Sequence, residues 1–78
     1  MAVEDTVKEV LNKVLDVQPD DIQPDARLEE SLEVDSTEMV EISVGIKKAC
    51  NVPLADNELK KSHSFNDIVG ILKAKGVA

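Results

Sequence analysis

The sequence lacks tryptophan and tyrosine, and it has one aromatic residue, Phe65. The hydrophobic core must therefore be aliphatic, and 11 valines, 7 leucines and 5 isoleucines supply it. Cys50 and His63 are the single cysteine and histidine, which excludes an internal disulfide and leaves too few ligands for a zinc site. No apolar run approaches the roughly 20 residues that a membrane span needs. We expect no metal and no membrane-spanning segment.

Basic residues are also scarce, with 9 Lys plus Arg against 16 Asp plus Glu and a net charge of -7. A nucleic-acid partner is disfavoured because phosphate binding needs clustered Lys and Arg, whereas a basic partner protein suits this charge. The first ten residues carry Glu4 and Asp5 where a signal peptide would be basic, which predicts a cytoplasmic protein. A length of 78 residues predicts one domain, residues 1–78.

Helical periodicity dominates the first part of the chain. Apolar residues recur at helical spacing from Val3, and the helix should end near Asp16 because Pro19 follows. A long ordered loop is expected up to about Asp35, with one helical turn near residues 26–31. Four apolar residues should pin this loop to the core: Val17, Ile22, Leu28 and Leu32.

A second helix is predicted over residues 36–50. Asp35 can serve as its N-cap and Glu38 can complete a capping box, while Asn51 and the proline after it supply the stop. Two apolar stripes are expected, one with Met39, Ile42, Ile46, Ala49 and Cys50 and a second with Val40 and Val44. The polar face is expected to hold Glu38, Glu41, Gly45 and Lys48.

Two further helices complete the expected fold. A short one is predicted over Asp56–Lys61, and a last helix should follow Ser64, with Asp67 completing a second capping box and Gly76 just past its end. The fold class is therefore all-α: a small four-helix bundle of three longer helices and one short helix, with a long ordered first loop.

The chain has little means of catalysis by itself. It contains no glycine-rich phosphate loop and no nucleophile elbow, and its one histidine is expected to flank the Ser64 cap. Cys50 is expected in the core, and the acids Asp20, Asp21 and Asp25 fit turns better than a calcium loop. We expect that the protein is not an enzyme.

Ser36 is the one place that could carry chemistry. Its hydroxyl stands at the positive end of a helix, where a phosphate group is favoured, although Asp35, Glu38 and Glu41 surround it with negative charge. A phosphodiester adds one negative charge and so meets milder repulsion than a phosphomonoester. Local pattern alone leaves two interpretations open, an attachment site or merely a capping box.

The whole chain resembles the acyl carrier proteins. The resemblance rests on Val17-Gln18-Pro19-Asp20-Asp21-Ile22, Leu28-Glu29-Glu30-Ser31-Leu32, Asp35-Ser36, Val40-Glu41, Val52-Pro53 and Ser64-Phe65-Asn66-Asp67. It implies that a phosphopantetheinyl transferase esterifies Ser36 with 4′-phosphopantetheine from coenzyme A. The thiol of that arm, rather than Cys50, would hold acyl intermediates as thioesters for enzymes of fatty acid or related lipid and polyketide biosynthesis.

The resemblance also implies two surfaces beside the second helix. Asp35, Glu38 and Glu41 become candidates for docking to basic patches on partner enzymes. An apolar cleft for the acyl chain would be lined by Val40, Val44, Ile46 and Leu59. The chain departs from the family pattern at Glu33, Thr37, Ser62 and Lys47-Lys48, which hints at a carrier dedicated to one pathway.

Two alternatives to an acyl carrier remain open from the sequence. An aminoacyl or peptidyl carrier would use the same serine, although the strong acidity disfavours it. An unmodified acidic helical interaction module would use Ser36 only as a helix-start residue. The protein is expected to be monomeric, and replacing Ser36 by alanine would separate carrier from module.

Overall fold

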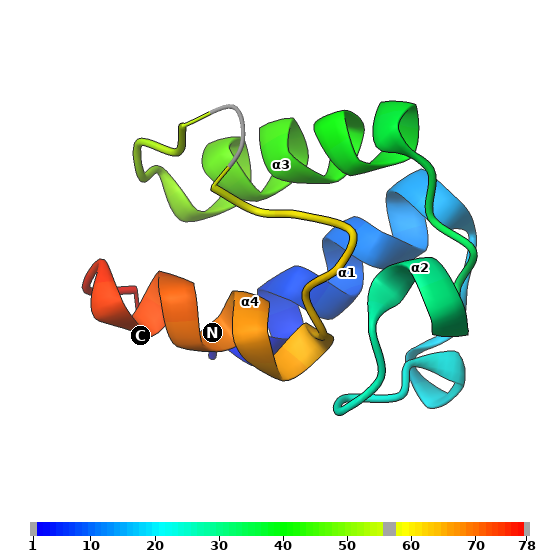
Figure 1. The fold of residues 1–78 in the computed structure, drawn as a ribbon. Coiled ribbons are helices and arrows are strands. Elements are labelled where there is room, and N and C mark those ends of the chain that lie inside the picture. Colours follow the sequence, from blue (N-terminus) through cyan, green and yellow to red (C-terminus); the bar gives the residue numbers. More distant parts are fainter. Residues whose placement is uncertain (1, 56–57, 78) are drawn as a thin grey trace.

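The computed structural model describes residues 2–55 and 58–77. In chain order they form α1 (Val3–Leu15), the 3-10 turn η1 (Pro19–Asp21), α2 (Leu28–Ser31), α3 (Ser36–Cys50) and α4 (Phe65–Ala74) (Figure 1). The described residues hold no strand, only an isolated bridge between Arg27 and Ser64. None of the helices among them has the length and apolar character needed to cross a membrane. The predicted all-helical architecture is confirmed.

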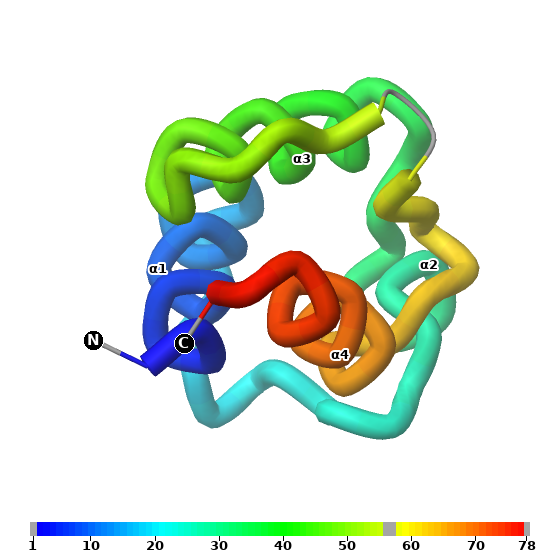
Figure 2. The backbone as a smooth tube through the Cα atoms, turned by 90° about the vertical axis from the view of Figure 1, so that its left-hand side faces the viewer, coloured from blue at the N-terminus to red at the C-terminus, as the bar shows by residue number. Residues whose placement is uncertain are grey.

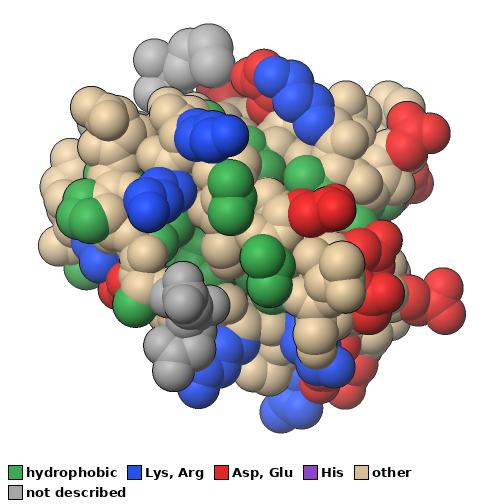
Figure 3. Space-filling model, turned by 90° about the horizontal axis from the view of Figure 1, so that it is seen from above, with side chains coloured by type: hydrophobic (Ala, Val, Ile, Leu, Met, Phe, Trp, Pro, Cys, Tyr) green, Lys and Arg blue, Asp and Glu red, His purple; other side chains and the backbone are tan. Residues whose placement is uncertain are grey.

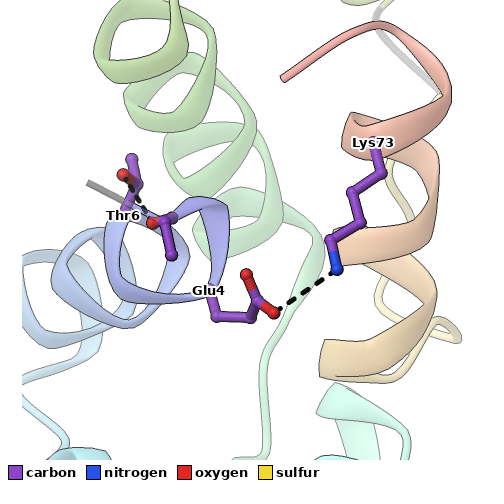
Figure 4. A network of polar contacts seen from close by, with 4 residues as sticks. Glu4, Thr6 and Lys73 are labelled. Carbon is purple, nitrogen blue, oxygen red and sulfur yellow. Dashed lines mark hydrogen bonds and ion pairs between the residues drawn. The ribbon is translucent and has the colours of Figure 1, made fainter. Parts of the chain in front are cut away.

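Helix α1 is the element on which the other long helices pack. Its buried residues Val3, Val7, Val10 and Leu11 face both α3 and α4. An ion pair at the surface also joins α1 to α4, with 3.4 Å between the Glu4 carboxylate and the Lys73 ammonium (Figure 4). The fully buried aliphatic side chains are Val3, Val7, Leu11, Leu28, Ile42, Ile46, Ile68 and Leu72. The core is thus aliphatic, as the composition predicts.

Gly45 lies at the contact between α3 and α1, and its predicted place on a polar face is wrong. A Cβ atom added there would come within 2.9 Å of Val10 Cγ1, so a larger residue would force the two helices apart. The helical wheel shows this position beside charged residues, but it cannot show which neighbouring helix approaches. Glycine is used here to allow close packing of α3 on α1.

The segment before α4 is joined to α2 by backbone hydrogen bonds. The Leu28 N–H donates to the His63 carbonyl and the Glu29 N–H to the Lys61 carbonyl, each at 3.0 Å. These bonds satisfy amide groups at the start of α2 that no side chain caps. Figure 2 shows this segment running beside α2. Residues 59–63 are thereby fixed along one side of the molecule.

The predicted short helix over Asp56–Lys61 is wrong for the part that the structure describes. Residues 58–61 form turns, while residues 56 and 57 lie outside the described residues. The short helix of the fold is instead α2, at the place where one helical turn is expected. The physical reason is that the Lys61 and His63 carbonyl groups accept hydrogen bonds from the start of α2.

The chain between α1 and α3 is anchored by apolar side chains. Ile22 and Leu28 are buried, and Val17 and Leu32 are partly buried against the core. Asp16, with φ of 56°, ends α1 in the left-handed conformation. The four predicted anchors are therefore found where the sequence indicates, and they set the position from which α3 starts.

Candidate functional site

Ser36 is the first residue of α3, and its position is fixed by the capping box before it. The Glu38 N–H donates to Asp35 Oδ1 at 2.7 Å, and the Asp35 N–H donates to Glu38 Oε1 at 3.1 Å. Val34 and Met39, which stand on either side of this box at the spacing of a hydrophobic staple, are both buried. Ser36 itself is exposed. A rigid helix start therefore presents a hydroxyl group to solvent.

A pocket of about 370 Å³ opens beside Ser36. One wall comes from α3 and the other from the segment that is hydrogen-bonded to α2. Its lining residues are Glu29, Ser36, Met39, Val40, Ser43, Leu59, Lys60, Lys61 and Ser62. Apolar side chains and two lysines thus line the pocket, next to the serine hydroxyl.

A second pocket of about 330 Å³ continues along α3. It is lined by Val40, Ser43, Val44, Lys47, Leu54 and Ala55. Because Val40 and Ser43 line both pockets, the two form one path along α3, which we call the α3 groove. Val40 and Val44 are 59% and 44% exposed, and they are the large hydrophobic residues that the described surface shows most openly.

The four residues predicted to line an acyl cleft take different places. Val40 and Leu59 line the first pocket, and Val40 and Val44 line the second. Ile46 is fully buried in the core and lines neither pocket. The reason is its position on α3, where it shares the buried stripe with Ile42 and Met39.

Charge along the exposed face of α3 changes sign from one end to the other. Asp35 and Glu41 are exposed and Glu38 is half-buried at the Ser36 end, whereas Lys47 and Lys48 are exposed at the far end. Figure 3 shows acidic side chains gathered on one side of this face, basic ones on the other and hydrophobic ones between them. The acidic groups surround the serine as the sequence predicts.

The Cys50 thiol lies away from Ser36, in the last turn of α3. It is half-buried against the core, and burial raises the pKa of the thiol. A raised pKa keeps the sulfur protonated and weakly nucleophilic at neutral pH. Among residues 2–55 and 58–77, no group of His, Cys, Asp and Glu side chains could hold a metal ion.

The start of α3 offers an environment for an anion beside Ser36. The free amide groups at the start of α3 favour an anion near Ser36, and Lys60 and Lys61 line the adjacent pocket. His63 Nδ1 accepts the Lys60 N–H at 3.1 Å, so the single histidine is engaged in a turn. Sequence periodicity gives no signal for these two lysines, because a backbone pairing with α2, distant in sequence, places their segment beside the pocket.

Comparisons with known proteins agree with this geometry. The family model described as "Phosphopantetheine attachment site" matches residues 5–72. The acyl carrier protein of Wolinella succinogenes is 30% identical over 88% of this chain and 91% of its own length. That of Campylobacter fetus is 33% identical over 92% and 94%, and that of Bdellovibrio bacteriovorus is 27% identical over the full length of both.

No solved structure matches the chain significantly. The family assignment therefore rests on the match to the family model over most of the chain, on the full-length similarity to the curated relatives, and on a helical fold that presents an exposed serine at a helix start. The chain belongs to the acyl carrier proteins, whose cofactor is 4′-phosphopantetheine.

Proposed function

We propose that this protein carries acyl intermediates as thioesters on a 4′-phosphopantetheine arm esterified to Ser36. It would deliver them to enzymes of fatty acid biosynthesis or of a related lipid or polyketide pathway, and would catalyse no reaction by itself. The observation that carries the proposal is the exposed hydroxyl of Ser36 at the first position of α3, opening onto a pocket of about 370 Å³.

Attachment would require from this chain only the exposed Ser36 hydroxyl. The Ser36 oxygen would form a bond to the phosphorus next to the pantetheine of coenzyme A, while the pyrophosphate bond breaks and the nucleotide leaves. The serine proton would pass to a base on the phosphopantetheinyl transferase, because this chain places no histidine there. The resulting phosphodiester carries one negative charge, which the α3 amide groups and Lys60 and Lys61 would balance against the nearby acids.

Docking to partner enzymes is proposed for the acids around the serine. Asp35, Glu38 and Glu41 share the Ser36 end of α3, so a basic patch on a partner that binds them would receive the arm at the same place. Opposite charges across an interface raise the association rate and fix the orientation. Phosphopantetheinyl transferase and acyl-transferring enzymes are the partners that this surface suits.

Shelter for the acyl chain is proposed in the α3 groove. Val40, Val44 and Leu59 supply apolar walls, and the groove begins at the serine that bears the arm. Burying a methylene group contributes about 0.8 kcal/mol, so even a partly inserted chain would be retained there. Ile46 supports this wall from the core and would not contact the chain.

The test is enzymatic loading followed by intact mass measurement. Protein is incubated with acyl-coenzyme A and a broad-specificity phosphopantetheinyl transferase, then treated with neutral hydroxylamine, which cleaves thioesters. We expect one acyl-phosphopantetheine per chain, from which hydroxylamine removes only the acyl group. Ser36→Ala should gain no mass and keep its helical content.

Two matched variants make the result specific. Ser62→Ala removes another exposed hydroxyl from the same pocket and should load normally, and Cys50→Ala should load and hold the thioester normally. No gain of mass by a folded wild type, with the transferase active on a control carrier, would refute the proposal. If Cys50→Ala does not hold the acyl group, we would conclude that the thioester forms on Cys50 and not on the arm.

A further inference from the structure

Ser43 lies two helical turns after Ser36, on the same side of α3. A separation of seven residues in a helix returns almost to the same face and advances about 10.5 Å along the axis. Ser43 therefore sits along the direction in which the α3 groove leaves the attachment residue. It lines both pockets of the groove, at the place where they join.

The Ser43 hydroxyl is a buried polar group without a partner. Its Oγ atom is shielded from solvent, and within the described part of the chain no group forms a hydrogen bond with it. A serine inside a helix often donates to the carbonyl group four residues earlier, and this one does not. Most buried hydroxyl groups are hydrogen-bonded. The unpaired Ser43 hydroxyl could therefore take its hydrogen-bond partner from a molecule that enters the groove.

The surroundings of Ser43 in the groove are mainly apolar. Met39, Val40 and Leu59 line one side of the junction, and Val44 and Leu54 line the other. The other serine of the first pocket beyond Ser36, Ser62, is exposed to water. Ser43 is therefore the buried hydrogen-bonding group that a chain lying along the groove would meet.

We propose that Ser43 makes the groove selective for acyl chains that carry an oxygen, as a hydroxyl or a keto group, over saturated chains of equal length. This inference rests on the proposed function, because it assumes that the cargo enters the α3 groove from Ser36. The serine hydroxyl donates to a keto oxygen, and it either donates to or accepts from a hydroxyl. A saturated chain leaves the Ser43 hydroxyl buried and unpaired, whereas an oxygenated chain gives it a partner.

The experiment compares cargos and variants in one cycle. Wild type, Ser43→Ala, Ser43→Thr and the control Thr6→Ala, which removes a hydroxyl from α1 outside the groove, are loaded from coenzyme A analogues that carry non-hydrolysable acyl groups. The cargos are octanoyl and octanoyl with a hydroxyl or keto oxygen near the thioester, at mid-chain or near the chain end. The midpoint of thermal unfolding is measured for each acylated form and for the form that bears the arm alone.

In wild type, at least one oxygenated cargo should raise the midpoint more than octanoyl does. The gain should disappear in Ser43→Ala, so that the cycle gives a coupling of about 4 to 8 °C for a domain of this size. Ser43→Thr retains the hydroxyl and should retain the preference, and Thr6→Ala should behave as wild type.

Three results would overturn the inference, and two of them leave the proposed function standing. If the protein loads but Ser43→Ala leaves the ranking of cargos unchanged at every oxygen position, the hydroxyl has no role in selection. If Ser43→Ala changes the midpoint of the form bearing the arm alone and not the ranking, the arm is the partner. If no variant loads at all, the proposed function itself fails and takes this inference with it.

Discussion

Helices α3 and α4 both begin with a capping box, but the first residue of α3 is exposed and the first residue of α4 is buried. In α3 the Asp35 and Glu38 groups bond reciprocally at 2.7 and 3.1 Å, and in α4 Ser64 and Asp67 do so at 3.1 and 3.0 Å. The first residue of α3, Ser36, is exposed, while the first residue of α4, Phe65, is 3% exposed.

The difference shows what a capping box determines and what it does not. The box sets where a helix begins, and both begin where the sequence predicts. At α4, other segments of the same chain cover the helix start. The Asn66 N–H donates to the Pro24 carbonyl, and the Lys8 ammonium lies 5.9 Å from the Phe65 ring. At α3 the described residues do not cover Ser36 in this way, so the same motif leaves a serine exposed in one helix and starts the other with a buried core residue.

The largest expected effect on stability comes from truncating the first residue of α4, compared with truncating the first residue of α3. Phe65→Ala should lower the free energy of unfolding by about 3 to 5 kcal/mol, because it empties a buried site. Ser36→Ala should change the free energy of unfolding by no more than about 0.5 kcal/mol, because its side chain is exposed. Urea denaturation measures both, and equal losses would remove the distinction between the two helix starts.

A smaller effect is expected on partner enzymes. Glu41→Lys should lower kcat/KM of phosphopantetheinyl transferase about tenfold, since it reverses a charge beside Ser36, while unfolding stays within about 0.5 kcal/mol of wild type. Glu9→Lys, which makes the same charge change on α1, is the control. An equal loss in both variants would assign the effect to net charge instead of to the docking surface.

The two capping residues themselves should differ modestly. Asp35→Ala and Ser64→Ala should each destabilise the protein by about 1 kcal/mol, because each leaves an amide group of the first turn without its partner. The cost should be greater for Ser64, which is 6% exposed, because water reaches its vacated amide less easily. Thermal and urea unfolding of the two variants test this order. The reverse order would show that exposure does not determine how much each cap contributes to stability.

The smallest expected effect is the pH dependence of the α4 cap. The hydrogen bond from the Ser64 N–H holds the pKa of the Asp67 carboxyl below its ordinary value. A carboxyl with a lowered folded pKa contributes stability above its unfolded pKa and loses it as the pH falls through the folded pKa. Asp67→Asn should flatten this part of the acid side of the stability curve. If NMR titration gives the Asp67 carboxyl a pKa at or above its ordinary value, this prediction is wrong.

Local features of the fold could be predicted from the sequence because they depend on neighbouring residues. Helical spacing and the two boxes predict α1, α3 and α4, and Asn51, in the left-handed conformation, ends α3 where expected. The place of Ser36 followed from the box, while its suggested role needed resemblance to a family, because Asp-Ser at a helix start is common to many caps.

Features that depend on contacts distant in sequence could not be predicted. The bonds from Leu28 and Glu29 to residues 61 and 63 have no periodic signal, so the short helix was assigned to the wrong segment. The same pairing forms one wall of the first pocket and brings Lys60 and Lys61 to it. The separation of seven residues places Ser43 on the same face of α3 as Ser36, and this spacing is the signal in the sequence that points to Ser43.

The most direct test of the account is the location of the arm. Wild type is loaded with coenzyme A and a broad-specificity phosphopantetheinyl transferase, digested, and sequenced by fragmentation mass spectrometry. The account predicts phosphopantetheine on Ser36 alone, with Ser64 at the other capped helix unmodified. Phosphopantetheine on Ser62, Ser64 or any residue other than Ser36 would contradict it.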